Sequence, residues 1–95
     1  MLKGFSPTQE LIRKECDSLR DMLLAKNKAY GNSAINPLRI FSKASPIEQI
    51  NVRLDDKLSR LARGQAAGED AEMDLIGYLV LKRVAIKLQK KGRIK

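Results

Sequence analysis

A chain of 95 residues is long enough for one small domain with one modest core. It holds 19 Lys/Arg, 11 Asp/Glu, one Cys and no His, for a net charge of +8. This composition excludes a two-lobed enzyme, a disulfide framework and histidine acid–base catalysis, and it argues against a zinc site. No apolar run approaches the roughly 20 residues of a membrane span, so we expect a cytoplasmic protein without a membrane partner.

The first helix is expected from Ser6 to about Ala29. The segment Ser6-Pro7-Thr8-Gln9 offers an N-cap serine, a proline at the first helical position and a glutamine that completes a capping box. Gly31-Asn32 ends the pattern. The apolar row at helical spacing consists of Ile12, Cys16, Leu19 and Leu23.

A long, turn-rich connection is expected to follow, over residues 30–44. It nevertheless contains four large apolar side chains. A connection of this length inside a compact domain is commonly functional or carries a short helix of its own. The apolar residues are Ile35, Leu38, Ile40 and Phe41.

The second helix is expected to begin with the same device, Ser45-Pro46-Ile47-Glu48, and to end near Arg63-Gly64, where glycine can adopt the left-handed cap. Its apolar side chains fall within about 80° of arc, which predicts one narrow buried seam. The seam consists of Ile47, Ile50, Leu54, Leu58 and Leu61.

The third helix is expected to start near Gly68-Glu69-Asp70, with acids in its first turn and cations in its last. Its middle, residues 75–81, is apolar nearly all round, which is typical of a helix buried on more than one side. Two further helices of this size cannot cover it completely. The sequence therefore predicts an all-α domain of three main helices that assembles as an oligomeric bundle, a homo-oligomer.

The positive charge is concentrated at the end of the chain. Residues 1–81 hold 12 Lys/Arg and 11 Asp/Glu, whereas residues 82–95 hold seven Lys/Arg and no acid. We interpret residues 1–95 as a single helical domain in which 88–95 form a basic C-terminal tail. Such a tail binds phosphate backbones non-specifically, or it simply complements the carbonyl end of a helix.

A first candidate site lies on the second helix. Arg53, Lys57 and Arg60 follow at i, i+4 and i+7 and share about 60° of arc beside the apolar seam. Asp56 is within reach of Arg60. Arginine binds phosphate oxygens with two parallel hydrogen bonds, and lysine acts as a compact charge. The alternative is a solvated charged face with an ordinary Asp56–Arg60 pair.

A second candidate site lies at the end of the first helix. Two lysines, a tyrosine and small polar residues there can bind a phosphate and stack on a base. The alternative is a helix C-terminus with favourable cations and a glycine cap. The candidate residues are Lys26, Lys28, Tyr30, Asn32 and Ser33.

A third candidate site consists of Asp70 and Asp74, on the apolar face of the third helix. A buried carboxylate there needs a partner, which Arg53, Lys57 or Arg60 can provide. The functional interpretation makes Asp74 an acceptor for a base or a ribose, or a magnesium ligand. The alternative is a structural ion pair. No cofactor and no metal site are predicted for a binding protein. Magnesium is expected only if the protein is an enzyme.

These segments together resemble the small α-helical nucleotide-modification-associated domains of phages and bacteria. The resemblance covers roughly residues 19–82 and depends on order and spacing: Lys26-Asn27-x-x-Tyr30-Gly31, Asn36-Pro37-Leu38 with Phe41, Arg53-Leu54-x-Asp56-Lys57-x-x-Arg60-Leu61, and Asp70-x-x-x-Asp74-Leu75-x-x-Tyr78. It implies a phage-encoded helical domain that handles nucleotides. The matching positions are Tyr30, Asn36, Arg53, Asp56, Lys57, Arg60 and Asp74.

We therefore expect a non-enzymatic nucleotide-binding protein. It would act as an oligomeric sponge that hides a cyclic or other small nucleotide signal from anti-phage defence, by fold-level analogy with phage sponge proteins. One alternative is an enzyme of nucleotide metabolism, either a kinase without a Walker loop or a magnesium-dependent phosphohydrolase that uses Asp70 and Asp74. A second alternative is a nucleic-acid binder that uses the basic tail.

Overall fold

The fold is all-α, as the sequence predicted. A computed structural model describes residues 4–64 and 70–94, and within those ranges the only regular elements are three helices. Helix α1 spans Pro7–Tyr30, α2 spans Pro46–Ala62 and α3 spans Ala71–Lys90. No described helix is both long enough and apolar enough to cross a membrane.

Helices α1 and α2 begin at the serine caps that the sequence predicts. Ser6 Oγ accepts from the Gln9 amide at 3.1 Å, and Gln9 Oε1 accepts from the Ser6 amide at 2.9 Å, which completes the capping box. Ser45 Oγ accepts from the Glu48 amide at 3.2 Å. At α3 the cap is Asp70, whose Oδ1 accepts from the Met73 amide at 3.0 Å. The sequence predicted this start near Gly68-Glu69-Asp70, of which Gly68 and Glu69 lie outside the described residues.

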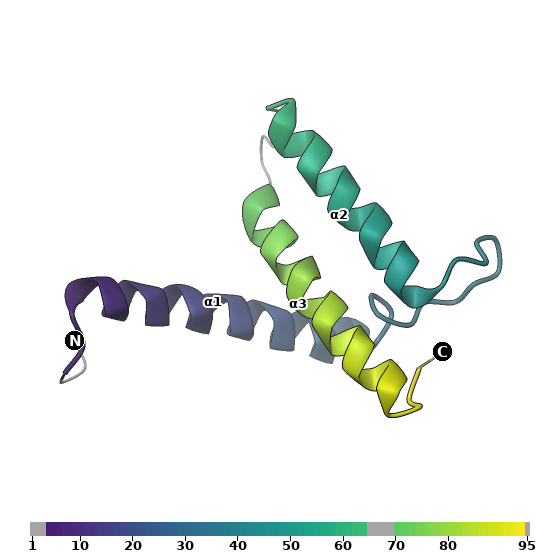
Figure 1. Cartoon of the computed structure of the whole chain (residues 1–95), viewed down its shortest axis with the longest axis horizontal. Helices are drawn as coiled ribbons and strands as arrows, with labels where there is room; N and C mark the ends of the chain where they lie inside the picture. Colours follow the sequence, from purple (N-terminus) through teal and green to yellow (C-terminus); the bar gives the residue numbers. More distant parts are fainter. Residues whose placement is uncertain (1–3, 65–69, 95) are drawn as a thin grey trace.

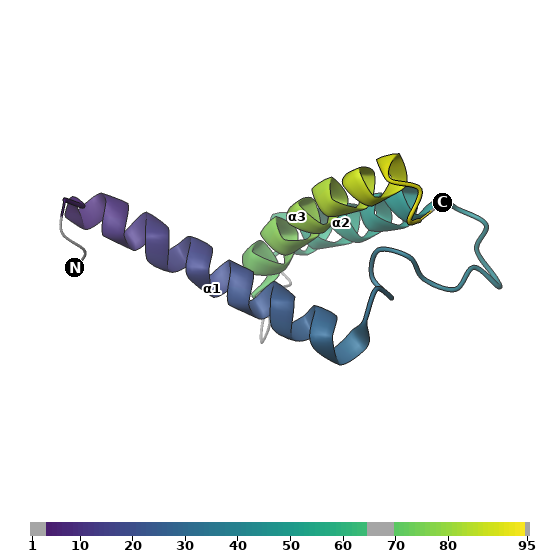
Figure 2. The same cartoon turned by 90° about the horizontal axis from the view of Figure 1, so that it is seen from below.

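Helices α2 and α3 form an antiparallel pair, and α1 crosses it on the side of α3 (Figures 1 and 2). The second half of α1 lies against α3, whereas its first half extends beyond the pair. Close approach at the crossing depends on Gly77 of α3. A Cβ atom there would lie 3.3 Å from Leu23 Cδ2 and from Met22 Cε. The fold is thus a two-helix body with a long third helix laid across it.

The core lies between α2 and α3 and receives two side chains from outside the helices, Ile35 and Ile94. Ile50 and Ala85 are completely buried, and Leu54 and Ile94 are 8% exposed. Ile35, from the connection between α1 and α2, joins this cluster at 3% exposure. The partly buried residues packed around the cluster are Ile47, Leu75, Tyr78, Leu81 and Leu88.

The predicted α2 seam is buried in its first half only. Ile50 and Leu54 are buried, but Leu58 and Leu61 are 51% and 39% exposed. The reason is that, in the described part of the chain, α2 packs against α3 and has no contact between its backbone and that of α1. The end of the seam therefore has one neighbouring helix rather than two.

The connection from residue 31 to residue 45 contains turns and no helix of its own. Asn32 O accepts from the amides of Ile35 at 3.0 Å and Asn36 at 2.7 Å, and this turn directs Ile35 into the core. The other apolar side chains of the connection stay outside it: Leu38, Ile40 and Phe41 are 87%, 68% and 100% exposed.

The basic C-terminal segment is anchored to the domain. Lys87 and Lys90 occupy the last turn of α3, where cations complement the helix dipole. The chain then turns at Gly92, which has a φ of 71°, so that Ile94 reaches the core. Residues 88–94 are therefore a helix end and a folded return, although they carry the predicted charge.

Two predicted apolar faces remain uncovered within the single chain. Ile12 and Cys16 of the α1 row are exposed, and only Leu19 and Leu23 are partly buried. On α3, Ile76 and Leu79 are 41% and 48% exposed. The oligomeric bundle predicted from the sequence would cover such faces. The structure of a single chain does not test this assembly, which stays a prediction.

Removing the two serine caps should have unequal effects. In dilute protein, we expect Ser45→Ala to lower the free energy of unfolding by about 1 kcal/mol, because α2 carries the core. Ser6→Ala should leave it almost unchanged, since the start of α1 lies beyond the body and can fray locally. Urea denaturation followed by circular dichroism measures both. Equal losses would show that the start of α1 unfolds together with the core.

Candidate functional site

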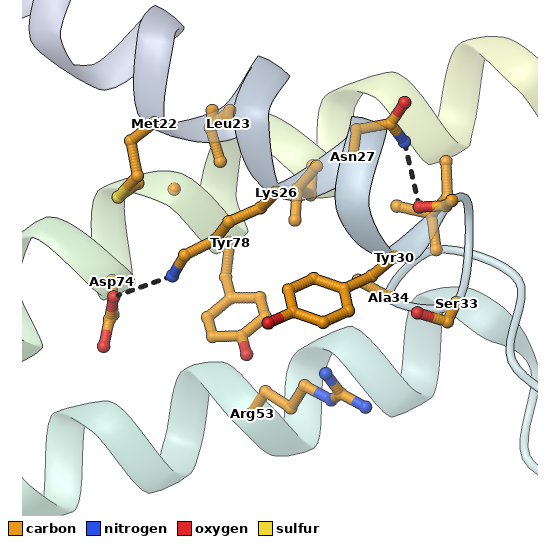
Figure 3. Close-up of a pocket in the computed structure, with 14 residues that line it drawn as sticks. Met22, Leu23, Lys26, Asn27, Tyr30, Ser33, Ala34, Arg53, Asp74 and Tyr78 are labelled. Carbon is orange, nitrogen blue, oxygen red and sulfur yellow. Dashed lines mark hydrogen bonds and ion pairs between the residues drawn. The ribbon is translucent and has the colours of Figure 1, made fainter.

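A pocket of about 320 Å³ lies where α1, the turn after it, α2 and α3 meet (Figure 3). This volume falls at the lower end of the range of about 300–1,000 Å³ found for small-molecule sites. Its walls come from four segments of the chain. They are formed by Met22, Leu23, Lys26, Asn27, Tyr30, Gly31, Ser33, Ala34, Ile35, Arg53, Asp74, Gly77, Tyr78 and Leu81.

Helix α1 supplies one wall because Leu23, Lys26 and Tyr30 share a helical face. Leu23 contacts α3 at Gly77, and this contact directs the next two positions along the face into the pocket. The helix ends at Gly31, whose φ of 61° favours glycine. The amide of Gly31 donates to Asn27 O at 2.7 Å.

Asn27 fixes the turn that follows α1. Its Nδ2 donates to Gly31 O and to Asn32 Oδ1, both at 3.0 Å. These two hydrogen bonds join the last turn of the helix to the residues that leave it. This turn contributes Ser33 and Ala34 to the pocket wall (Figure 3).

Two aromatic rings and one guanidinium converge in the pocket. The Arg53 guanidinium carbon of α2 lies 5.8 Å from the centre of the Tyr78 ring of α3, which is a cation–π contact. The Tyr30 ring enters the same space from α1 (Figure 3). Tyr30 is 72% exposed, so most of its surface is free to contact a ligand.

Asp74 connects the three helices. Its Oδ2 lies 3.5 Å from Lys57 Nζ of α2, and its Oδ1 lies 3.9 Å from Lys26 Nζ of α1. The side chains of Asp74 and Lys57 are only 27% and 13% exposed. Of the three partners predicted for this carboxylate, Lys57 is therefore the one that the fold provides, and Lys26 adds a weaker, exposed contact.

Five of the eleven predicted site residues line the pocket, namely Lys26, Tyr30, Ser33, Arg53 and Asp74. Lys57 lies behind them, on Asp74. Asn32 supports the turn, and Lys28 and Asn36 are exposed outside the lining. Arg60 pairs with Asp56 at 3.2 Å, which is the ordinary helix-surface pair named as the alternative.

Sequence reasoning did not select two polar lining residues, Asn27 and Tyr78. Both stand inside the quoted motifs, Asn27 beside Lys26 and Tyr78 four positions after Asp74. Spacing i, i+4 from Asp74 was the signal that would have found Tyr78 on the same helix face. The apolar walls Met22, Leu23 and Leu81 follow only from the crossing of α1 over α3.

The two carboxylates of the enzyme alternative have separate protein partners. Asp70 caps α3 through the Met73 amide, and Asp74 faces two lysines. In residues 4–64 and 70–94, no three His, Cys, Asp or Glu side chains gather in one cluster.

Asp74 should contribute more to stability than Asp56. We expect Asp74→Asn to lower the free energy of unfolding by about 1–2 kcal/mol, because breaking a half-buried ion pair costs more stability than breaking an exposed one. Asp56→Asn, which removes an exposed pair on the same protein, should cost less than about 0.5 kcal/mol. Urea denaturation measures the loss in both variants. Equal losses would show that the contacts of Asp74 to α1 and α2 do not stabilise the fold.

The lining of the pocket favours an anion with an apolar or aromatic part. Lys26 and Arg53 against Asp74 leave one formal positive charge, and Lys57 adds a second from behind Asp74. Tyr30 and Tyr78 supply aromatic surface next to this charge. Comparison of the chain with family models, with curated proteins and with solved structures finds no match.

Proposed function

We propose that the protein binds a small phosphorylated nucleotide in this pocket and holds it without converting it. The observation that carries the proposal is the meeting of Arg53, Tyr78, Tyr30 and Lys26 in one cavity, from three different helices. A nucleotide has the matching composition, an aromatic base joined to an anionic phosphate. The ligand class is the one implied by the resemblance to nucleotide-modification-associated domains.

In the proposed complex, Arg53 binds the phosphate. Its guanidinium forms paired hydrogen bonds with phosphate oxygens, and these bonds are stronger than neutral ones. The Tyr78 ring at 5.8 Å limits the orientations of this side chain, so that less freedom is lost on binding. Lys26 adds a second positive charge from the opposite wall.

In the proposed complex, the ring of Tyr30 stacks on the base. Stacking of a base on an aromatic side chain contributes about 1–3 kcal/mol and tolerates any base. The ring is largely exposed on the pocket side of α1, and the hydroxyl of Ser33 lies in the adjoining wall (Figure 3). A serine hydroxyl both donates and accepts, so it suits a ribose or a base edge.

Sequestration is favoured over turnover by the chemistry of the lining. The sequence has no histidine, and its only cysteine, Cys16, lies outside the lining. A protein that hides a cyclic or other small nucleotide signal from anti-phage defence needs tight binding alone. We propose this sponge role for a phage-encoded protein acting in the cytoplasm of the infected cell.

The test is a panel of mono-, di- and cyclic nucleotides with magnesium. Calorimetry measures binding, after which the protein is denatured and the recovered nucleotide is analysed by chromatography. The sponge predicts a tight complex that returns intact nucleotide. A changed nucleotide would show an enzyme instead. Binding of duplex DNA alone, falling steeply with salt, would assign function to the C-terminal cations and contradict the pocket.

A further inference from the structure

The second half of α3 carries a row of cations that lies outside the pocket. Arg83, Lys87 and Lys90 follow at i, i+4 and i+7, which places them within about 60° of the helix circumference. All three residues are exposed. Together with Ile86 they line a hollow of about 210 Å³ in the surface of the protein. We call Arg83, Lys87 and Lys90 the α3 basic row.

The fold turns this row away from the core. Ala85 is completely buried, and Leu81 and Leu88 pack against the same cluster. At about 100° per residue, these three positions lie on the side of the helix opposite the α3 basic row. The second half of α3 therefore presents its apolar face to the core and its positive charge to the surroundings.

The α3 basic row has no carboxylate beside it. On the other helices, Arg13 pairs with Asp17 at 2.7 Å, and Lys57 lies 3.5 Å from Asp74. In residues 4–64 and 70–94, no ion pair includes a member of the row. The reason lies in the sequence, which has no Asp or Glu after Asp74. Like charges three or four residues apart on a helix repel each other, so this arrangement does not stabilise α3.

The helix dipole accounts for only part of the row. Lys87 and Lys90 stand in the last turn of α3, where cations are favourable. Arg83 stands seven residues before the end of the helix at Lys90, and the dipole effect is confined to the last turn. The end of the helix thus explains two of the cations but not the length of the row.

We propose that the α3 basic row binds the phosphate backbone of duplex nucleic acid. A duplex carries one negative charge per about 1.7 Å of its axis, and cations that neutralise phosphates release condensed counterions. At 1.5 Å per residue, the row extends over about 10 Å of α3. Three side chains spread over this length meet several phosphates at once. The charge of the row is thus complementary to a continuous backbone.

Single strands and membranes fit this surface less well. The described lining of the hollow contains no aromatic ring, whereas single strands are bound by stacking of their bases on aromatic side chains. A helix at a membrane surface inserts its apolar face, but the apolar face of this part of α3 is packed into the core. Charge without stacking or insertion favours the backbone of a duplex, whose phosphates carry no sequence information.

This binding goes beyond the proposed function and does not depend on it. The α3 basic row and the pocket have no lining residue in common. A duplex can therefore bind the row whether or not a nucleotide occupies the pocket. Failure of one proposal leaves the other standing, because the first is tested with a duplex alone and the second with nucleotides alone.

The test measures the affinity for a short labelled duplex by fluorescence anisotropy. Three phosphate contacts predict that log K falls with log [salt] at a slope of about −2.7, which is about 40-fold between about 50 and 200 mM salt. The variant Arg83→Gln/Lys87→Gln/Lys90→Gln should weaken binding at the lower salt by at least about tenfold and make the slope shallower by about 2.7. Circular dichroism checks that the variant is folded.

The matched control is Lys14→Gln/Lys43→Gln/Arg63→Gln. It removes the same three charges from exposed positions outside the row, so the two variants have equal net charge. The control should keep wild-type affinity and slope. Equal losses in both variants would show that net charge alone attracts the duplex and would overturn the proposal. Wild-type binding by the row variant, or no binding by the wild-type protein, would overturn it as well.

Two further measurements identify the partner and the place of binding. Vesicles of phosphatidylcholine and phosphatidylserine should not sediment with the protein. Sedimentation that is lost in the row variant would assign the row to a membrane and overturn the proposal. Nucleotide in excess should leave the affinity for the duplex unchanged, whereas displacement of the duplex would place its phosphates in the pocket and also overturn it.

Discussion

Replacing Arg53 by alanine should lower nucleotide affinity by at least tenfold while leaving the fold intact. A hydrogen bond to a charged group contributes about 1.5–3 kcal/mol, and each 1.4 kcal/mol is a factor of ten in the dissociation constant. Arg53 is exposed, and its described contact is the Tyr78 ring of the pocket. Calorimetry with the nucleotide that binds the wild-type protein most tightly measures the loss.

Two further variants make this result specific. Arg63→Ala removes an exposed arginine at the C-terminal end of the same helix, outside the pocket, and should keep wild-type affinity. Arg53→Lys keeps the charge but loses the planar fork, so affinity should lie between those of wild type and Arg53→Ala. If Arg63→Ala weakens binding as strongly as Arg53→Ala, net charge rather than the pocket controls binding.

Ile50→Ala should cause the largest loss of stability from a single substitution in α2. Ile50 is completely buried at the centre of the core between α2 and α3. Truncation of a buried isoleucine to alanine costs about 2–5 kcal/mol, from lost apolar burial and from the cavity that remains. A small domain has only about 5–15 kcal/mol in total. Urea denaturation of wild type and variant measures the difference.

Val52→Ala is the matched control for Ile50→Ala. Val52 is a β-branched aliphatic residue two positions along the same helix, but it is 65% exposed. Its replacement should change the free energy of unfolding by less than about 0.5 kcal/mol. If the two variants lose similar amounts, the core does not lie between α2 and α3 as described.

The helices were predictable because their signals are local. Ser6 and Ser45, each followed by proline, mark the first turns of α1 and α2, and hydrogen bonds within four residues confirm both caps. Gly31 ends α1 through its positive φ, as expected of glycine at a helix end. Such features depend on neighbouring residues alone, so tertiary packing does not alter them.

The pocket was predictable only in part, because it depends on how the helices cross. The sequence grouped Lys26 and Tyr30 at the end of α1 and drew attention to Arg53 of α2, and the fold brings these together. Spacing cannot tell that Tyr78 approaches Arg53, or that Lys57 rather than Arg60 reaches Asp74. Those contacts depend on the crossing of one helix over another.

The residues of the core were also predictable from the sequence only in part. Ile50 and Leu54 follow from helical periodicity, since they belong to the apolar seam of α2. Ile35 and Ile94 lie outside the helices, and no periodic pattern includes them. They are buried because turns at Asn32 and Gly92 fold their segments back onto α2 and α3.

The closeness of α1 to α3 at Gly77 has a consequence for ligand selectivity. The distance between α1 and α3 sets the width of the pocket. Gly77 sets that distance, although it has no side chain with which to contact a ligand. An alanine would require Met22 and Leu23 to shift by a few tenths of an ångström, and a larger side chain would move α1 further. Variation at position 77 thus provides a graded means of adapting the pocket to bulkier ligands while the polar residues of its lining stay the same.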